Sequence, residues 1–574
     1  MKTRNILFSA LMAAGLAGGL TGCVGDLDVA PLDPTVNTGD RAYATAEDYE
    51  NALAKIYGIW AMSGQDGASS SDIYIGDSGN TTLVRSWFIL QIQPTDEMKN
   101  ANTETWGANM NFMNWGTTRI EPVEAVYQRC MYIVALANDF LKNLPNAPQG
   151  IDQNSYRAQA RFCRALAYYT LMDTFGNPPF ITEDNYSVSP AQIGRDGLFN
   201  WLDGELNELA SSNALPGRAT GADYGRASQG AAWALLARMY LNAEVYTGTA
   251  RYTDCMNACQ KVMDLGYGLA DQYSALFSGD NTTNPDATQE IIFPVILDGD
   301  ATQTWANLIA ASHPVYVDET TENAGGTAKQ EMCLNEWGIR EGWAGYRSTS
   351  NLVRTFEFAD SENPAAGEIL DKRGIFRDHN YEGEALTLRI GSKWEGTFHN
   401  TGWWVYKWTN LDHEGKPMYR TEDAATIIWP DTDIPLIRLA DVYLMYAESA
   451  ARSGQNLGTA VDLVNQLRAR GYERQGNYTI NENWLTASAT VSYDGPSVPF
   501  GNILNERMRE LYWEGQRRTD LIRFGLFTGN SYLWEWKNGA ENGAGTNERY
   551  NLYPIPQTDM QANGGLEQNP GYGN

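Results

Sequence analysis

Cys23 stands in a sequence context that favours covalent attachment of lipid to its thiol. A basic start is followed by an apolar run of about fifteen residues from Ile6 to Leu20, and Thr21-Gly22 precede the cysteine. The run is too short to span a bilayer and matches the apolar part of a secretory signal. Small residues before a cysteine are typical of lipoprotein processing, so we predict a signal peptide at 1–22 and a lipid anchor on Cys23. An ordinary secreted protein with a chance cysteine is the alternative.

Side chains that could bind metal or form disulfides are scattered along the chain. The four histidines stand singly, and the five cysteines beyond Cys23 are odd in number and widely spaced. A disulfide framework needs paired cysteines, and a metal site needs several ligands at fixed spacing. Cys255 and Cys259 lie four residues apart on a helical pattern, where each is interpreted as a small apolar residue. We therefore predict neither a metal site nor another cofactor.

The remaining chemical motifs give little support to catalysis. Asp431 and Asp433 form an Asp-x-Asp pair without the following ligands and glycine of a calcium-binding loop, so we expect acidic loop residues leading into a helix. No nucleophile-elbow, metalloprotease, Walker or Rossmann motif stands in a fitting context. The chain has 70 carboxylate residues, so a catalytic pair has to be weighed, but the motifs predict no enzyme.

The charge of the chain bears on its partners. The formal net charge is −28 over 574 residues, and no basic stripe interrupts it. Such a surface repels phosphate backbones, so we expect no nucleic-acid partner. No stretch after the signal approaches eighteen apolar residues, so the lipid is the only membrane attachment that the sequence predicts.

The elements that must position any site are mainly helical. Residues 23–42 are acidic and lack periodicity, which is typical of a flexible tether. We predict one body at 43–574, with helical pairs at about 45–265 and 436–526 and a loop-rich insertion at about 270–435. The pairs resemble tetratricopeptide packing, although no strict 34-residue period is present. Long loops on a rigid helical scaffold are where binding sites usually lie.

The clearest helical patterns have defined ends. Residues 153–175 carry an apolar stripe that stops at Gly176, and 226–245 and 251–265 are predicted to form a helical hairpin. Within the insertion, IIFPVIL, ALTLRIG and WWVYKW are typical of short strands. The aromatic cluster there is expected to pack against the helices; its members are Trp394, Trp403, Trp404, Tyr406 and Trp408.

Five segments spread over nearly the whole chain carry a family resemblance. They are RAQARFCRALAYYTLMDTFGNPPFITEDN, ASQGAAWALLARMYLNAEVYTG, IPLIRLADVYLMYAESAARSG, ERMRELYWEGQRRTDLIRFG and NLYPIPQTDMQANGGLEQNPGY. In this order they resemble the SusD/RagB family. DLDVAPLDP, PTDE at 94–97 and RFGLFTGNSYLWEWKNGAENG are most similar to its founding, starch-binding member.

The resemblance implies a function and a location. Members of the family are outer-membrane lipoproteins that bind glycans and cover a TonB-dependent transporter. It therefore implies a non-catalytic, surface-exposed protein whose partners are an oligosaccharide and a SusC-like transporter. Asp26 and Asp28 resemble the acidic signal that sends such lipoproteins to the cell surface. A family member that captures peptides, and a lipoprotein glycosidase, are the alternatives.

The resemblance also implies a glycan site. Asp77 and Arg85 fall where the founding member has polar sugar contacts, Trp305 where it has a stacking tyrosine, and Trp343 where it has a tryptophan. Tryptophan faces would stack on the apolar faces of sugar rings, while Arg85 and Asp77 would bind the hydroxyls. The alternative is a structural role, in which the tryptophans pack within loops and Asp77 and Arg85 form an ordinary ion pair.

One part of the implied site departs from the family pattern. After PTDE the founding member has two stacking tryptophans, whereas this chain has Met98-Lys99-Asn100-Ala101-Asn102. Trp106 follows and is a partial substitute, so Asn100, Asn102 and Trp106 join the candidate glycan contacts. Starch or another α-glucan is the first choice of ligand, with a fructan or another glycan as the alternative.

Overall fold

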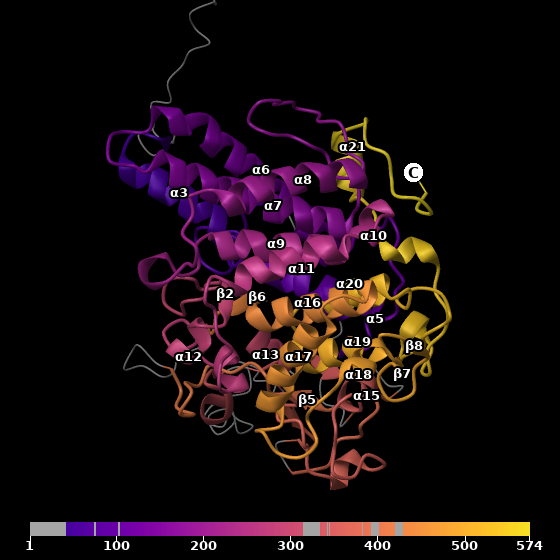
Figure 1. The fold of residues 1–574 in the computed structure, drawn as a ribbon. Coiled ribbons are helices and arrows are strands. Elements are labelled where there is room, and N and C mark those ends of the chain that lie inside the picture. The colour runs from indigo at the N-terminus through magenta and orange to yellow at the C-terminus, as the bar shows by residue number, and fades with distance from the viewer. Residues whose placement is uncertain are drawn as a thin grey trace, which may run out of the picture.

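A computed structural model describes residues 42–73, 76–101, 104–313, 333–340, 342–343, 345–380, 383–391, 401–418 and 429–573. Cys23, the predicted signal peptide and the tether up to residue 41 lie outside these residues. The described chain is mainly helical, which confirms the predicted fold class. Figure 1 shows the helices stacked in a curved series, with the loop-rich insertion at the end opposite α6, α7 and α8.

The amino-terminal helices pack in sequence order. α3 (Ala46–Gly58) begins at a capping box in which Thr45 and Asp48 satisfy each other's backbone N–H groups. α6 (Glu121–Asn143) packs against α7 (Gln153–Thr174), and α7 packs against α8 (Arg195–Ser211). The predicted helix at 153–175 is thus confirmed.

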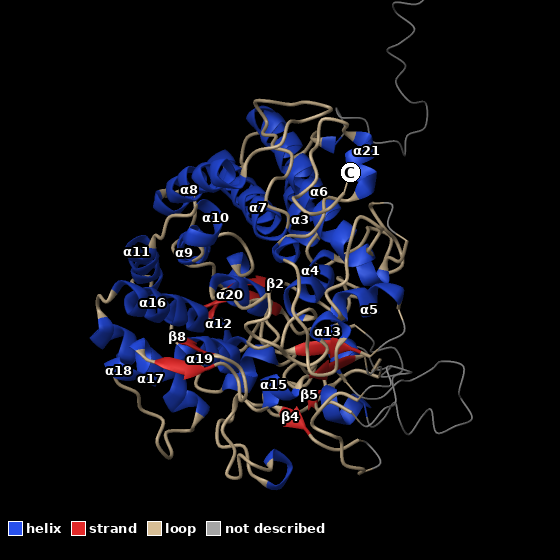
Figure 2. Cartoon of the chain, turned by 90° about the vertical axis from the view of Figure 1, so that its right-hand side faces the viewer, coloured by secondary structure: helices blue, strands red, loops and turns tan. Residues whose placement is uncertain are grey.

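The second helical set continues this series. α9 (Gln229–Leu241) packs against α11 (Tyr252–Met263), which confirms the predicted hairpin, and α11 packs against α16 (Leu439–Ser453). α16 in turn packs against α17 (Leu457–Gly471). Helices separated by almost two hundred residues in the sequence therefore lie side by side (Figure 1). Figure 2 shows α8, α11, α16 and α18 along one edge of the molecule.

Further helices complete the scaffold. α4 (Leu83–Ile92) is buried on every side, and this is why its nearly continuous apolar sequence shows no helical period. The others are α5 (Thr105–Asn111), α10 (Ala243–Thr247), α12 (Pro285–Thr288), α13 (Leu308–Ser312), α15 (Ser350–Val353), α18 (Glu482–Thr486), α19 (Gly501–Leu511), α20 (Arg517–Arg523) and α21 (Gln557–Ala562).

The strands are short and form antiparallel pairs. They are β1 (Met98–Asn100) with β3 (Tyr346–Ser348), β2 (Ile291–Val295) with β6 (Ile434–Arg438), β4 (Phe376–Arg377) with β5 (Trp404–Val405), and β7 (Ser488–Thr490) with β8 (Ser497–Pro499). IIFPVIL and WWVYKW thus contain strands. The prediction of a strand in ALTLRIG is wrong, because Ala385 and Thr387 make only isolated bridges. Asp433 leads into β6 and not, as predicted, directly into a helix.

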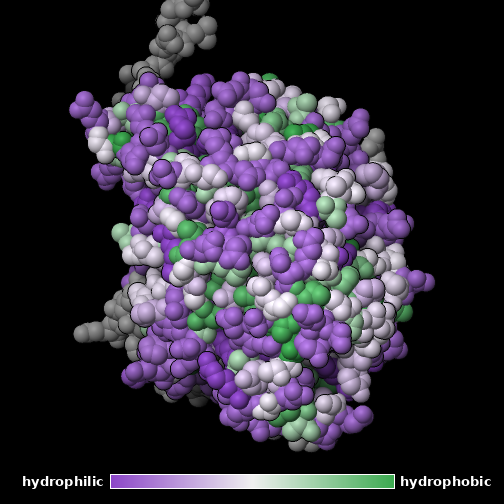
Figure 3. All heavy atoms as spheres, in the orientation of Figure 1, coloured by the Kyte–Doolittle hydropathy of each residue, from purple (hydrophilic) through white to green (hydrophobic). Residues whose placement is uncertain are grey.

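The core accounts for the aromatic cluster and the cysteines. Trp403, Trp404 and Trp408 are buried, as predicted, and Trp394 lies outside the described residues. Cys130, Cys163, Cys255 and Cys259 are free thiols, and all four, like Cys333, are buried. No helix in the described ranges is both long and apolar enough to cross a bilayer. The face shown in Figure 3 is mainly hydrophilic, with apolar residues scattered singly over it.

A network of buried ions ties the insertion to the helices. Arg438, at the end of β6, is 1% exposed at its side chain and bonds Glu290, Glu510 and Glu514 at 2.6–2.8 Å. Glu290 directly precedes β2, whereas Glu510 lies in α19 and Glu514 follows it. One guanidinium therefore holds the sheet at the edge of the insertion against the carboxy-terminal helices.

Candidate functional site

The structure brings the predicted residues Asp77, Arg85, Trp305 and Trp343 into one cluster. Asp77 is exposed in the turn before α4, where its Oδ1 accepts a hydrogen bond from the Gly79 N–H at 2.7 Å. A Cβ on Gly79 would lie 3.1 Å from that oxygen and 3.4 Å from Trp305. The glycine thus allows the aspartate turn and the tryptophan to approach each other.

Arg85 joins the segments of this cluster. It lies in the first turn of α4, is 4% exposed, and donates from Nη1 to the Gly79 carbonyl (3.2 Å) and the Trp305 carbonyl (3.5 Å). Its Cζ lies 4.9 Å from the ring centroid of Trp343, a cation–π distance. Arg85 therefore fixes both tryptophans, and it bonds backbone carbonyls in addition to any hydroxyl that it would reach in a ligand.

The two predicted tryptophans are half-buried and in contact. Their ring centroids lie 5.8 Å apart and their planes are tilted by 46°. The backbone N–H of Trp343 donates to the Ala310 carbonyl at 2.6 Å, and this bond ties the segment of Trp343 to α13. Half-burial matters here, because it holds the indoles in place while leaving part of each exposed for contact.

The strand pair β1–β3 supports the cluster from beneath. Tyr346, in β3, accepts a hydrogen bond from Arg85 Nε at 3.4 Å, and burial raises the pKa of its phenol. Asn100 is the β1 partner of Tyr346. The segment after PTDE thus lies next to the cluster, as its sequence position implies.

Two of the three candidates after PTDE are buried. Asn100 is 1% exposed and exchanges hydrogen bonds with Asn111, while Trp106, in α5, is 6% exposed. The structure therefore corrects their assignment as direct contacts. The physical reason is that β1 is covered by β3 and α5 and turns its side chains inward. Asn102 lies outside the described residues.

A third tryptophan, which was not predicted from the sequence, joins the cluster. The Trp429 ring lies 4.5 Å from that of Trp305, centroid to centroid, at an interplanar angle of 72°. Trp429 is half-buried, like the other two. Its only sequence signal is its place two residues before Asp431, so nothing short of the tertiary fold links it to Trp305.

The acidic pair after Trp429 has a structural role. Asp431 Oδ1 accepts from the Gly299 N–H at 3.2 Å, and Asp433 Oδ1 accepts from the Leu297 N–H at 2.8 Å. Burial raises the pKa of Asp433 to about 7. In the described part of the chain, no three His, Cys, Asp or Glu residues are grouped so that they could hold a metal ion.

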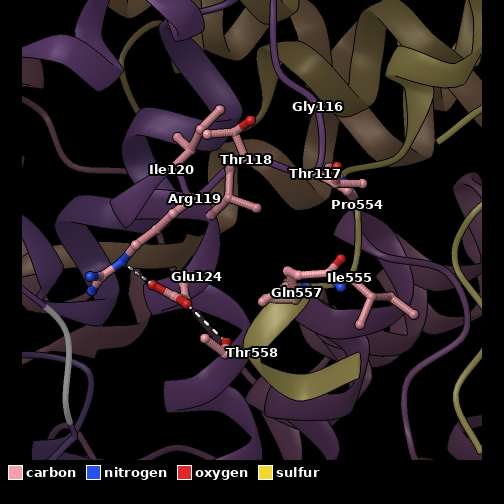
Figure 4. Close-up of a pocket in the computed structure, with 12 residues that line it drawn as sticks. Gly116, Thr117, Thr118, Arg119, Ile120, Glu124, Pro554, Ile555, Gln557 and Thr558 are labelled. Carbon is pink, nitrogen blue, oxygen red and sulfur yellow. Dashed lines mark hydrogen bonds and ion pairs between the residues drawn. The ribbon is translucent and has the colours of Figure 1, made fainter. Parts of the chain in front are cut away.

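Two cavities lie outside the cluster, and none of its residues lines either of them. One, of about 330 Å³ and largely apolar, is lined by the end of α3, by the residues after it up to Met62, and by parts of 224–226 and 293–302. The other, of about 50 Å³, lies between residues 116–124 and 554–558 (Figure 4), where Glu124 accepts from both Arg119 and Thr558.

Arg119, which lines the smaller cavity, lies near the turn that carries Asp77. The Arg119 Nη2 atom would lie 3.9 Å from a Cβ on Gly76, and Glu121 lies closer still. Burial, together with the charges of Asp77 and Glu124, raises the pKa of Glu121, against the opposing effect of Arg119. Glu121 thus lies close enough to Asp77, Glu124 and Arg119 to interact with their charges.

The combined arrangement defines a class of protein. Indole faces beside a carboxylate and a guanidinium form the type of surface that contacts both the apolar faces and the hydroxyl rims of a sugar. Here that surface is carried by loops on a scaffold of helical pairs. Two family models match the chain: the "SusD family" over residues 289–572 and "Starch-binding associating with outer membrane" over residues 80–241.

Comparison with individual proteins places the chain within that class. It is 32% identical over 608 aligned residues to "Starch-binding protein SusD" of Bacteroides thetaiotaomicron, with all of both chains covered. It is 23% identical to "SusD-like protein P25" of Formosa agariphila, with 71% of this chain and 70% of that protein covered. The chain belongs to the SusD family.

Solved structures share the fold. "Surface glycan-binding protein A" from Bacteroides fluxus superposes with a TM-score of 0.64 at 19% identity, covering 92% of this chain and 100% of that one. The protein of the same name from Bacteroides thetaiotaomicron, in complex with laminarihexaose, gives 0.61 at 17% identity with the same coverage. The predicted tetratricopeptide-like architecture agrees with this fold.

Proposed function

We propose that this protein is a non-catalytic, surface-exposed lipoprotein that captures oligosaccharides and delivers them to a SusC-like TonB-dependent transporter in the outer membrane. The observation that carries the proposal is the cluster of Asp77, Arg85, Trp305 and Trp343, assembled from three separate segments. Full-length similarity to a starch-binding relative supports the glycan as ligand. Starch or another α-glucan is the first choice, and a fructan or another glycan is the second.

The chemistry of capture follows from the cluster. Trp305 and Trp343 would stack on sugar rings, because an indole offers a large rigid apolar area at low entropic cost. Arg85 covers part of Trp343 with its guanidinium, so a sugar would use the remainder of that ring. Asp77, the most exposed member, would accept hydrogen bonds from hydroxyls.

A modest affinity suits this role. A site built on stacking and a few hydrogen bonds binds at roughly millimolar strength, about −4 kcal/mol. Attachment beside a transporter raises the effective concentration of the ligand, so weak capture is sufficient. Asn102, which lies outside the described residues, remains part of the proposal as a polar contact.

Calorimetry against a glycan panel tests the proposal. The chain from residue 24 onward is titrated with starch, laminarin, inulin and other polysaccharides, and with a peptide library. Heat of binding from at least one glycan is expected. Heat from peptides alone would favour the peptide-capturing alternative, and reducing ends released from a glycan would establish a glycosidase.

The lipid anchor has its own prediction. Cys23→Ala removes the thiol that carries the acyl chains, so the variant should leave the outer-membrane fraction. Fractionation is carried out in cells that lack the transporter, because a bound transporter would retain the variant. Unchanged membrane association there would contradict the anchor while leaving the glycan site untouched.

A further inference from the structure

Trp429 reaches the candidate glycan site from a segment 124 residues beyond Trp305. The two rings are in edge-to-face contact, 4.5 Å between centroids. Trp305 also contacts Trp343, at 5.8 Å. Trp305 therefore contacts both of the other tryptophans, and we call the three rings the aromatic row.

The segment that carries Trp429 is held in place by a close backbone approach. A Cβ on Gly299 would lie 2.6 Å from the Trp429 carbonyl oxygen, closer than real Cβ atoms come to other atoms. Asp431, two residues on, accepts a hydrogen bond from the Gly299 N–H at 3.2 Å. Only glycine fits at position 299, and its missing side chain lets the loop before Trp305 pack directly against the backbone of Trp429.

The row is not flat. Trp343 is tilted by 46° to Trp305, and Trp429 by 72°. All three rings are half-buried and keep part of their surface exposed. A ligand that contacts all three must therefore change direction between successive units, which an oligosaccharide does through its glycosidic bonds.

We propose that Trp429 is a third aromatic contact for the ligand and extends the site by at least one sugar ring beyond Trp305. The inference rests on the proposed function, since it assigns the chain length that the glycan site recognises. A disaccharide fills the part of the site near Trp343 and Trp305, and only a longer oligosaccharide also reaches Trp429.

Titration with two ligand lengths tests this extension. The full chain, purified in detergent, is titrated with malto-, laminari- and fructo-oligosaccharides, each as a disaccharide and as a hexa- or heptasaccharide. In the series that binds, Trp429→Ala should weaken binding of the long ligand about fivefold or more and leave binding of the disaccharide nearly unchanged. Trp305→Ala should weaken binding of both ligands.

Two further variants keep the test independent of folding losses. Trp429→Leu keeps apolar bulk without a flat face, and Gly299→Ala displaces the Trp429 backbone without removing the indole. Both should show the same length dependence as Trp429→Ala. Thermal unfolding of each variant verifies that it is folded at the titration temperature.

The outcomes distinguish a failure of the extension from a failure of the glycan site. Wild-type affinity of Trp429→Ala for both ligand lengths would overturn the extension. An equal loss of affinity for both lengths would also overturn it, because Trp429 would then only position Trp305. The glycan site would stand in either case if Trp305→Ala weakens binding. A wild-type chain that binds no glycan at all would end the proposed function, and the extension with it.

Discussion

Arg85 shows how one side chain can build a site that it scarcely exposes. Its guanidinium bonds the carbonyls of Gly79 and Trp305 and lies over the ring of Trp343. The pattern of residues suggests a direct sugar contact, and the geometry adds a positioning role. The tryptophans provide the apolar area for contact with a sugar, so substituting one of them is the clearest test of the site.

Trp343→Ala should weaken glycan binding at least about tenfold, equivalent to about 1.4 kcal/mol. The reason is the loss of a stacking face and of the ring on which Arg85 lies. Isothermal titration with the best ligand of the panel measures the effect. Trp484→Ala, a half-buried tryptophan in α18, is the matched control and should bind normally. Equal affinities for the two variants would refute the placement of the site.

At the scale of elements, the segment 429–433 depends on the end of β2. Asp433 bonds the Leu297 N–H and the Thr282 hydroxyl, both in the chain around β2. These contacts bring Trp429 to Trp305. Burial raises the pKa of Asp433 to about 7, so the folded state holds a proton that the unfolded chain loses near the usual aspartate pKa of 3.8.

Asp433→Asn should remove a pH dependence of stability. In the wild type, the stabilisation from the neutral carboxyl is complete below about pH 4 and is lost as the pH rises through about 7. Relative to the variant, the wild-type free energy of unfolding should therefore fall by about 1.4 kcal/mol per pH unit between about pH 5 and about pH 7. Urea unfolding across this range measures it.

The control for this titration is Asp300→Asn, which changes an exposed aspartate in the loop after β2. Its stability should follow the wild-type curve at every pH. Parallel wild-type and Asp433→Asn curves would show that the buried carboxyl does not hold a proton in the folded state.

At the scale of the whole molecule, buried ion pairs join parts that are distant in sequence. Arg438 bonds three carboxylates, and two of them, Glu290 and Glu510, also bond Arg470. Buried ion pairs add little net stability, but removing one partner leaves charge without compensation. The insertion that carries the aromatic row is thus coupled to the helical scaffold.

Arg438→Met should lower the free energy of unfolding by about 3 kcal/mol or more, because the carboxylates around it lose a shared partner in a buried environment. Chemical denaturation measures the change. Lys372→Met breaks the exposed pair with Glu368 and should leave stability nearly unchanged. A similar small effect for both variants would show that the network is not coupled to global unfolding.

Helices with one apolar face were predictable because periodicity reports that face directly. The helices predicted at 153–175 and 251–265 agree with α7 and α11 to within a few residues at each end. α4 was not predicted, because a helix buried on all sides has no period to detect. β6 was hidden for a related reason, since a short apolar run does not separate strand from helix.

The helical scaffold, the family resemblance and four residues of the candidate site could be predicted from the chain alone, because local periodicity and ordered motifs are properties of the chain. Which aromatic groups meet depends on the tertiary structure. Asn100 is buried in β1 beside β3, Trp106 is buried in α5, and the contacts of Gly299 and Asp433 hold the segment that brings Trp429 to Trp305. Contacts between distant segments depend on packing and backbone approach, which have no signature in the sequence around either residue.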